Sequence, residues 1–243
     1  MIFKLILVIV LLIGLYGIFR YMYYLRKSMA LISWGEQFTR SYALGDSSKK
    51  PLRYVVLGDS TAVGVGADKL GESYPHQVAA ALAKTNYVTV VNLAISGARV
   101  DDVLKKQLPK LGDLKPDVIT LSIGGNDATH FTDLADYRKT MAAVLEALKN
   151  SGAKTMIVAA SPDMYLTPAL TRVISKPVGL RAAKQNEILR ELVKDSNIKI
   201  ADLYNDGKLD YHKNHALYAA DLFHPAQAGY AIWAQLFIHQ LSS

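Results

Sequence analysis

Cysteine is absent from this chain of 243 residues. The chain therefore forms no disulfide, no thiol nucleophile and no thiolate metal site, while its compartment stays open because exported proteins can also lack cysteine. Long basic runs are absent as well. Four of the 28 Lys and Arg residues lie in the first 28 positions, where no acid accompanies them, and the others nearly balance the 21 Asp and Glu residues. This distribution argues against a nucleic-acid partner.

The amino-terminal segment is predicted to be a single-pass membrane anchor over residues 1–28. Residues 5–19 form an unbroken apolar run. This run is shorter than the ~20 residues that usually cross a bilayer, but Lys4 can snorkel and the tyrosines that follow suit the head-group region. The alternative is a cleaved signal peptide, with a mature chain beginning near Leu31. The excess of cations after the run leans toward a cytoplasmic carboxyl-terminal domain by a single charge, so the side of the membrane stays uncertain.

Strand and helix patterns alternate through the rest of the chain. Residues 29–51 are predicted as a short helix and linker, and residues 52–243 as one globular domain. Short apolar stretches bounded by turn residues predict strands over residues 54–57, 88–93, 118–123, 155–160 and 198–203. Helical spacing follows over residues 74–85, 100–111, 134–149, 180–194 and 226–241. This alternation predicts a five-stranded parallel sheet with helices on both faces, a three-layer α/β/α sandwich.

Small and polar residues follow three of these predicted strands, and a fourth polar cluster precedes the last helix. The clusters are Gly58-Asp59-Ser60, Ser96-Gly97-Ala98, Gly124-Gly125-Asn126-Asp127 and Asp221-Leu222-Phe223-His224. Ligands bind outside the carboxyl ends of strands in open α/β sheets, so we expect the clusters to meet at one edge. Together they offer a hydroxyl, an imidazole, a carboxylate, a glycine amide and a side-chain amide, which are the groups that acyl transfer uses.

The order of these four blocks resembles the SGNH hydrolases, also called GDSL esterases and lipases. The resemblance covers residues 52–241, and each block alone is a weak signal. It implies a flavodoxin-like three-layer fold and a hydrolase that uses neither a metal nor an organic cofactor.

The resemblance also implies a role for each residue of the predicted site. Ser60 would be the nucleophile, His224 its general base and acid, and Asp221 the carboxylate that orients the imidazole. The oxyanion hole would consist of the backbone N–H groups of Ser60 and Gly97 and the side-chain amide of Asn126.

Other polar residues receive structural interpretations. Asp59 and Asp127 are predicted to bind nearby backbone amides, as aspartates beside tight turns commonly do. The trio Asp210, His212 and His215 lacks a further ligand motif, so we interpret it as a loop rather than a metal site. Residues 161–170 are irregular and apolar. This segment either forms a wall of an acyl pocket or packs as an ordinary loop, and the sequence leaves both interpretations open.

The sequence thus predicts a membrane-anchored serine esterase that hydrolyses a lipid-derived or O-acetyl ester through an acyl-serine intermediate. Two alternatives remain. An acyltransferase would use the same serine to deliver the acyl group to a sugar or lipid hydroxyl. A binding module on the same scaffold would have no turnover, but the competent residue types at all five functional positions argue against it.

Overall fold

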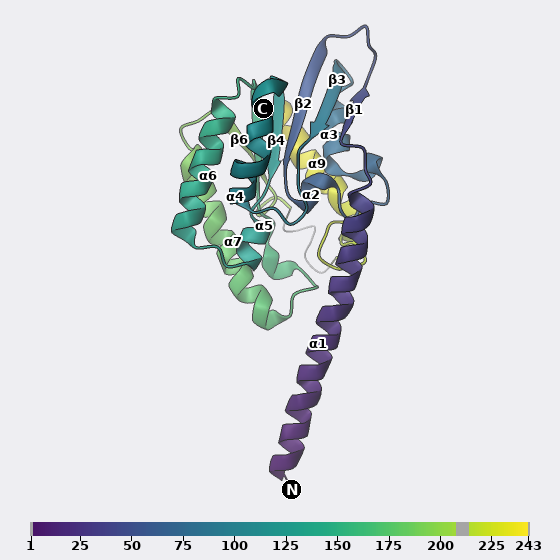
Figure 1. The fold of residues 1–243 in the computed structure, drawn as a ribbon, viewed down its shortest axis with the longest axis vertical. Helices are drawn as coiled ribbons and strands as arrows, with labels where there is room; N and C mark the ends of the chain where they lie inside the picture. Colours follow the sequence, from purple (N-terminus) through teal and green to yellow (C-terminus); the bar gives the residue numbers. More distant parts are fainter. Residues whose placement is uncertain (1, 208–213, 243) are drawn as a thin grey trace.

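A computed structural model describes residues 2–207 and 214–242. Within them the sheet has six strands, in the order β1-β3-β2-β4-β5-β6 (Figure 1). The strands are β1 (Ser41–Leu44), β2 (Pro51–Gly58), β3 (Tyr87–Asn92), β4 (Val118–Ser122), β5 (Thr155–Ala160) and β6 (Ile198–Asp202). Neighbours from β3 to β6 pair in parallel. The five predicted strands are therefore confirmed, and the parallel part of the sheet has the predicted composition.

The sixth strand corrects the prediction of a five-stranded sheet. β1 lies in the segment predicted as short helix and linker, and it pairs antiparallel with β3 at the edge of the sheet. It is only four residues long, with side chains that alternate between exposed and half-buried. Such a short edge strand lacks the apolar run that marks a buried strand, so its pairing with β3 determines its conformation.

Helices cover both faces of the sheet, as predicted. Tyr54 and Val56 of β2 point into one core beside α3 (Tyr74–Leu82) and α9 (Gln227–Ser242). Val55 and Leu57 point into the opposite core, beside α6 (Leu134–Lys149) and α7 (Arg172–Val193). All four side chains are fully buried. Successive side chains of a strand point to opposite faces, so a strand covered on both sides is apolar at every position.

Two helix predictions need correction at their boundaries. α7 begins at Arg172 rather than at residue 180, and it contains Pro177. A proline inside a helix removes one backbone hydrogen bond, so a helical turn on the amino-terminal side of Pro177 is not expected from the sequence. The helix predicted over residues 100–111 is broken into short turns. These are α4 (Val100–Asp102), η2 (Val103–Gln107), η3 (Leu108–Lys110) and η4 (Gly112–Leu114).

Further short helices lie in the connections. They are α2 (Ser60–Val63), η1 (Leu70–Glu72), α5 (Gly125–Thr129), η5 (Met164–Leu166) and η6 (His215–Leu217). Two of them, α2 and α5, directly follow β2 and β4, at the edge where the parallel strands end. This edge carries the polar clusters that the sequence singled out.

The amino-terminal helix α1 (Ile2–Gly35) is 34 residues long, and its first half extends beyond the domain (Figure 1). Its carboxyl-terminal part packs on the core through Leu31 and Ile32. Arg20 Nη2 also donates to the carbonyl of Pro168 (2.8 Å). Over the described residues, no helix combines the length and the hydropathy that a bilayer crossing requires. The structure therefore does not support the membrane anchor predicted for residues 1–28, and localisation at a membrane stays a prediction.

Candidate active site

Ser60 lies in a sharp turn between β2 and α2. The turn needs a glycine at position 58, where φ is +140° and a Cβ atom would lie 2.1 Å from the Ser122 carbonyl oxygen. Asp59 caps α2, because its Oδ1 accepts from Thr61 N (2.9 Å) and Thr61 Oγ1 (2.7 Å). The prediction that Asp59 binds a nearby backbone amide is confirmed. Ser60 follows as the first residue of α2, with 6% of its surface exposed.

The buried side chain of Gln107 fixes this turn through hydrogen bonds to the backbone of Gly58. Gln107 Oε1 accepts from Gly58 N (2.9 Å), and its Nε2 donates to Gly58 O (2.8 Å). The side chain is fully buried, so both amide atoms replace hydrogen bonds that water would otherwise supply. Sequence reasoning missed this residue, because a glutamine in a helical pattern is commonly solvent-exposed and no local motif marks it.

Ser60, His224 and Asp221 form a hydrogen-bonded chain. Ser60 Oγ lies 2.9 Å from His224 Nε2, and His224 Nδ1 lies 2.6 Å from Asp221 Oδ2. The other carboxylate oxygen of Asp221 accepts from the backbone N–H groups of Phe223 and His224, both at 3.0 Å. All three members of the chain are buried. The fold thus brings together a serine and a histidine that are 164 positions apart.

The electrostatics of Asp221 favour a charged carboxylate. Burial alone raises the pKa of this group, but the hydrogen bond and the charge of the His224 imidazole, with two backbone N–H donors, outweigh burial and hold the pKa below its usual range. An ionised carboxylate only accepts hydrogen bonds. The proton of a neutral imidazole therefore lies on Nδ1, which leaves Nε2 as an acceptor toward Ser60.

The loop that contains Gly97 lies beside Asn126. Gly97 has a φ of +78°, and a Cβ atom added there would have no other atom within 4 Å, so the backbone is open to a ligand. Asn126 Nδ2 donates to the carbonyl of Ala98 (3.0 Å), and Ile95 N donates to Gly58 O (3.1 Å). These bonds join the loop to α5 on one side and to the Ser60 turn on the other. Since an amide nitrogen carries two N–H groups, Asn126 retains a second donor for a ligand.

Asp127 ties the same loop to α5 from inside the protein. Its side chain is 1% exposed, and Oδ2 accepts from Val100 N (3.0 Å). The prediction of a backbone amide partner is right in kind, but the amide lies 27 residues away rather than in the local turn. Burial raises the pKa of Asp127 to about 6.

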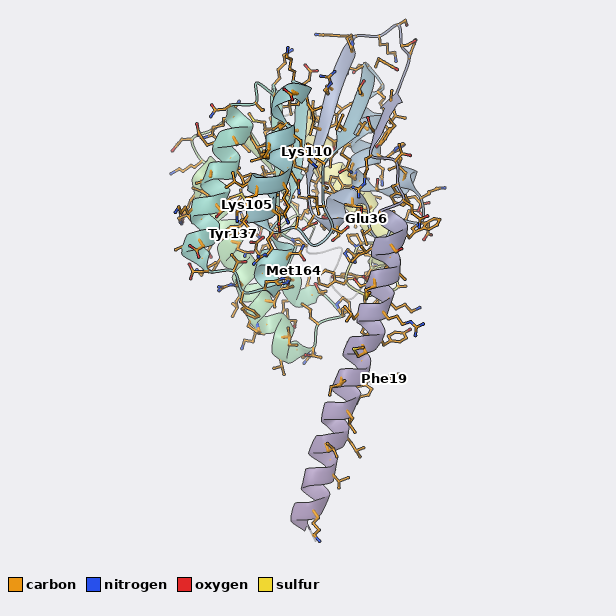
Figure 2. The ribbon with its side chains drawn as sticks, viewed as in Figure 1. Phe19, Glu36, Lys105, Lys110, Tyr137 and Met164 are labelled. Atoms are coloured by element: carbon orange, nitrogen blue, oxygen red, sulfur yellow. The ribbon has the colours of Figure 1, made fainter. Side chains whose placement is uncertain are left out.

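A second set of polar contacts holds the loop that contains Gly97, on its solvent-exposed side. Glu36, just after α1, accepts from Ser96 Oγ (2.6 Å). Arg40 forms an ion pair with Glu36 and donates to the carbonyl of Ala94 (3.3 Å). Figure 2 shows Glu36 where α1 meets the domain. The side chains of Glu36 and Arg40 are 44% and 30% exposed, so this tie is more solvated than the one made by Asp127.

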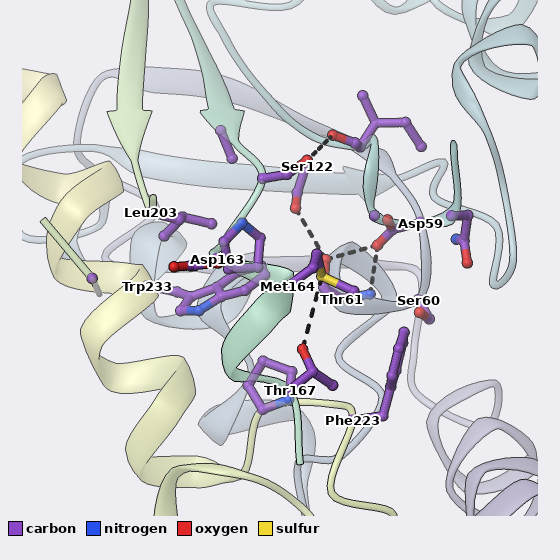
Figure 3. Close-up of a pocket in the computed structure, with 18 of the residues that line it drawn as sticks. Asp59, Ser60, Thr61, Ser122, Asp163, Met164, Thr167, Leu203, Phe223 and Trp233 are labelled. Carbon is purple, nitrogen blue, oxygen red and sulfur yellow. Dashed lines mark hydrogen bonds between the residues drawn. The ribbon is translucent and has the colours of Figure 1, made fainter. Parts of the chain in front are cut away.

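A pocket of about 60 Å³ opens beside Ser60 and Asn126. Met164, Leu166 and Thr167 line this pocket, so the segment 161–170 does form part of a pocket wall, and its role in binding an acyl group stays a prediction. Trp233 and Leu203 lie on the far side of the pocket from Phe223 (Figure 3). Further lining residues come from the strand ends and the loop before α9: Asp59, Thr61, Ser122, Ile123, Gly125, Ala159, Ser161, Pro162, Asp163, Gly207, Tyr218 and Pro225.

Only one of the three residues that we interpreted as a loop rather than a metal site lies in the described part of the chain. Asp210 and His212 lie outside the described residues, whereas His215 begins the short helix η6. Elsewhere in the described part of the chain, no three His, Asp or Glu side chains gather in a way that could hold a metal ion.

A model of the GDSL-like lipase/acylhydrolase family matches residues 56–232, which is most of the chain. The chain belongs to this family. Membership makes it an ester hydrolase, and the expected resemblance is confirmed. Esterase TesA of Pseudomonas aeruginosa is 25% identical over 136 residues, which cover 56% of this chain and 67% of that protein.

Solved structures of esterases and lipases share the fold. A catalytic mutant of the acetylxylan esterase Axe2 from Geobacillus stearothermophilus aligns with a TM-score of 0.63 at 20% identity, over 79% of this chain and 95% of its own. An extracellular lipase from Streptomyces rimosus aligns with a TM-score of 0.59 at 21% identity, over 78% of this chain and 99% of its own. At such identities the likeness concerns the fold.

Proposed function

We propose that this GDSL-family protein is a serine esterase that works through a covalent acyl-serine intermediate. The observation that carries the proposal is the buried chain Ser60–His224–Asp221, with distances of 2.9 and 2.6 Å. A serine hydroxyl is a weak nucleophile, and a neighbouring base that is itself oriented by a carboxylate makes it reactive.

In the proposed reaction His224 Nε2 takes the Ser60 proton while Ser60 Oγ bonds to the ester carbonyl carbon. The carbonyl oxygen becomes an oxyanion, and the N–H groups of Ser60, Gly97 and Asn126 donate to it. His224 then gives the proton to the alkoxy oxygen as the carbon–oxygen bond breaks, and the alcohol leaves. Water repeats the sequence on the acyl-serine, which releases the acid and restores Ser60. Asp221 stays ionised throughout and stabilises the imidazolium.

The size of the pocket supports a short acyl group. One ordered water needs ~15 Å³ on the scale used for such cavities, so about 60 Å³ accommodates only a few heavy atoms. The apolar side chains of Met164, Leu166 and Phe223 line it. We therefore propose an O-acetyl or similarly short ester as the reacting bond. A long-chain acyl ester is the second candidate, which the predicted lipid-derived substrates would require.

The test is hydrolysis of soluble p-nitrophenyl esters of increasing acyl length by the full chain. We expect the highest kcat/KM for the acetyl to butyryl esters and its loss in Ser60→Ala. Ser47→Ala, at an exposed loop serine, is the matched control and should retain activity. Full activity in Ser60→Ala would refute the proposal. Ser60-dependent transfer of the acyl group to an added sugar or lipid hydroxyl, in preference to water, would instead favour the acyltransferase.

A further inference from the structure

Outside α1, large apolar side chains are strongly exposed in one region of the described chain. They belong to the turn after α5, to η5 and to the first half of α7. We call this region the α7 surface; its members are Phe131 (50% exposed), Tyr165 (49%), Val173 (85%), Ile174 (49%) and Leu180 (63%). A soluble surface usually scatters such residues, so their gathering in one region marks an interaction site.

Contacts hold the members of the α7 surface together. Arg181 Nη2 donates to Phe131 O (2.9 Å), and its guanidinium lies 5.7 Å from the centre of the Phe131 ring. Gly179 lies against the backbone of Tyr165, where an added Cβ atom would come within 2.9 Å of Tyr165 N. Val173 and Leu180 are seven positions apart on one helix, so they share a face. These contacts connect the turn after α5 and η5 to α7, so the three segments form one continuous surface.

The first half of α7 carries only cations, whereas one acid, Asp133, lies near Arg181 two positions after Phe131. Residues 172–181 include Arg172, Lys176 and Arg181 and no acid, and Arg20 of α1 faces the same region, where it donates to Pro168 O. An apolar patch flanked by cations complements a layer that is apolar inside and anionic at its surface.

A groove of about 520 Å³ runs between α1 and the α7 surface. Gly14 and Gly17 leave room on the α1 side, while Leu170, Ile174 and Val178 line the other side. Leu170 and Val178 also pack in one cluster with Met164, which lines the pocket beside Ser60. The groove is therefore separated from the candidate active site by one layer of apolar side chains, and its volume and largely apolar lining suit a hydrocarbon chain.

We propose that the α7 surface docks on an anionic lipid surface and that the groove receives a hydrocarbon chain from it. Val173, Leu180 and Phe131 enter the apolar layer, and the flanking cations meet the anionic head groups. Docking places the pocket mouth near esters held in or at that layer. The inference goes beyond the esterase reaction and does not depend on Ser60 chemistry.

The absence of cysteine allows a direct test with the full chain. A single Leu180→Cys substitution carries an environment-sensitive nitrobenzoxadiazole label, and Ala143→Cys, at an exposed position on α6, carries the control label. With phosphatidylglycerol vesicles, we expect a blue-shifted and at least about twofold brighter emission from the label at position 180, quenched by brominated lipids. The label at position 143 should not respond. Phosphatidylcholine vesicles or high salt should weaken the response.

Because α1 is itself apolar, it could bind vesicles without the α7 surface. Vesicle binding alone therefore does not test the proposal, whereas the depth of the label at position 180 in the lipid layer does. An unresponsive label at position 180 on bound protein would overturn the proposal. So would a blue shift without vesicles in a protein that sizes as a dimer, because the surface would then be an interface between copies.

A kinetic comparison provides the second test. The double variant Val173→Asp/Leu180→Asp should turn over soluble p-nitrophenyl acetate like the unmodified chain but hydrolyse a vesicle-borne ester about tenfold more slowly. Ala143→Asp/Gln235→Glu adds the same charge at exposed positions elsewhere and should retain both activities. Equal loss on both substrates would contradict docking. Failure of all variants and the parent on the soluble ester would instead count against the proposed esterase.

Discussion

The two halves of the candidate site are held in different ways. On one half, Ser60, His224 and Asp221 hold one another through buried side-chain hydrogen bonds. On the other half, the proposed functional group of Gly97 is a backbone N–H, whose orientation depends on the loop that carries it. Its loop is held by Asn126 through Ala98, by Asp127 through Val100 and by Glu36 through Ser96.

This difference separates chemistry from positioning. In the first half each residue is both a proposed catalytic group and a support of the others, so its removal should affect the chemistry itself. In the second half Asn126 is both a proposed oxyanion donor and a support, whereas Asp127 and Glu36 only support the loop, and the importance of these two should follow their burial. Buried hydrogen bonds to charged groups contribute more than solvated ones, because water replaces a lost solvated bond. Four substitutions test this ranking, from the largest expected effect to the smallest.

Removal of the Ser60 hydroxyl should have the largest effect. Ser60→Ala leaves His224 and Asp221 in place but removes the nucleophile, and loss of a triad serine typically lowers kcat by about 10⁴-fold or more. Hydrolysis of p-nitrophenyl acetate measures the loss, and the melting temperature checks the fold. A decrease below about tenfold would show that the serine chemistry is wrongly assigned.

Asn126→Ala should have the next largest effect, because it removes both a proposed oxyanion donor and the bond to Ala98. Loss of one such donor typically lowers kcat by about 10²- to 10³-fold. Steady-state kinetics should show the change mainly in kcat rather than in KM. Asn150→Ala, at the exposed end of α6, is the matched control. A change confined to KM would indicate that Asn126 binds the ground state only.

Asp127→Asn should change how stability depends on pH. Burial raises the Asp127 pKa to about 6, above the ~3.9 of an unfolded aspartate. The folded state therefore retains the proton longer, and this stabilisation is present below about pH 4 and lost as the pH rises through 6. The free energy of unfolding of the native chain, minus that of the variant, should fall by about 1 to 3 kcal/mol between pH 4 and pH 7.

Urea unfolding at both pH values measures this difference for Asp127. Asp136→Asn, on the exposed surface of α6, provides the control. An identical difference between native chain and Asp127 variant at pH 4 and pH 7 would mean that the carboxyl titrates as it does in the unfolded chain.

Glu36→Ala should have the smallest effect. The Glu36 contacts with Ser96 and Arg40 are partly exposed, and such pairs contribute at most about 1 kcal/mol. We expect kcat to fall by about two- to fivefold with little change in KM. Glu36→Gln keeps an acceptor for Ser96 Oγ and should recover part of the rate. If Glu36→Ala matched Asn126→Ala in its effect on kcat, burial would not be what ranks the supports.

The sequence predicted most of the fold because its signals there are local. The strands β2 to β6 are apolar runs between turn residues, and Gly58 is required by the turn that carries Ser60. β1 was missed because four half-exposed residues become a strand only beside β3. The start of α7 was misplaced because tertiary packing outweighs the preference of Pro177.

In the candidate site, too, the residues in local motifs were predicted and those that depend on long-range contacts were not. Ser60, His224 and Asp221 stand in short motifs, and the structure brings them within hydrogen-bond distance. Two of the supports, Gln107 and Glu36, could not be predicted. Gln107 reaches Gly58 across 49 positions, and Glu36 reaches Ser96 across 60. A long-range contact of an ordinary polar residue leaves no spacing or composition signal, so only the folded chain identifies it.

The most direct test of the proposed acyl-serine mechanism is the mass of the protein during turnover. The full chain is mixed with p-nitrophenyl acetate, quenched in acid within the first turnovers and digested for mass spectrometry. We expect one acetyl group on the peptide that contains Ser60, formed at least as fast as p-nitrophenol is released in steady state, and no adduct in Ser60→Ala. Continued hydrolysis by Ser60→Ala, or an acetyl group that maps to another residue on the reaction path, would contradict the account.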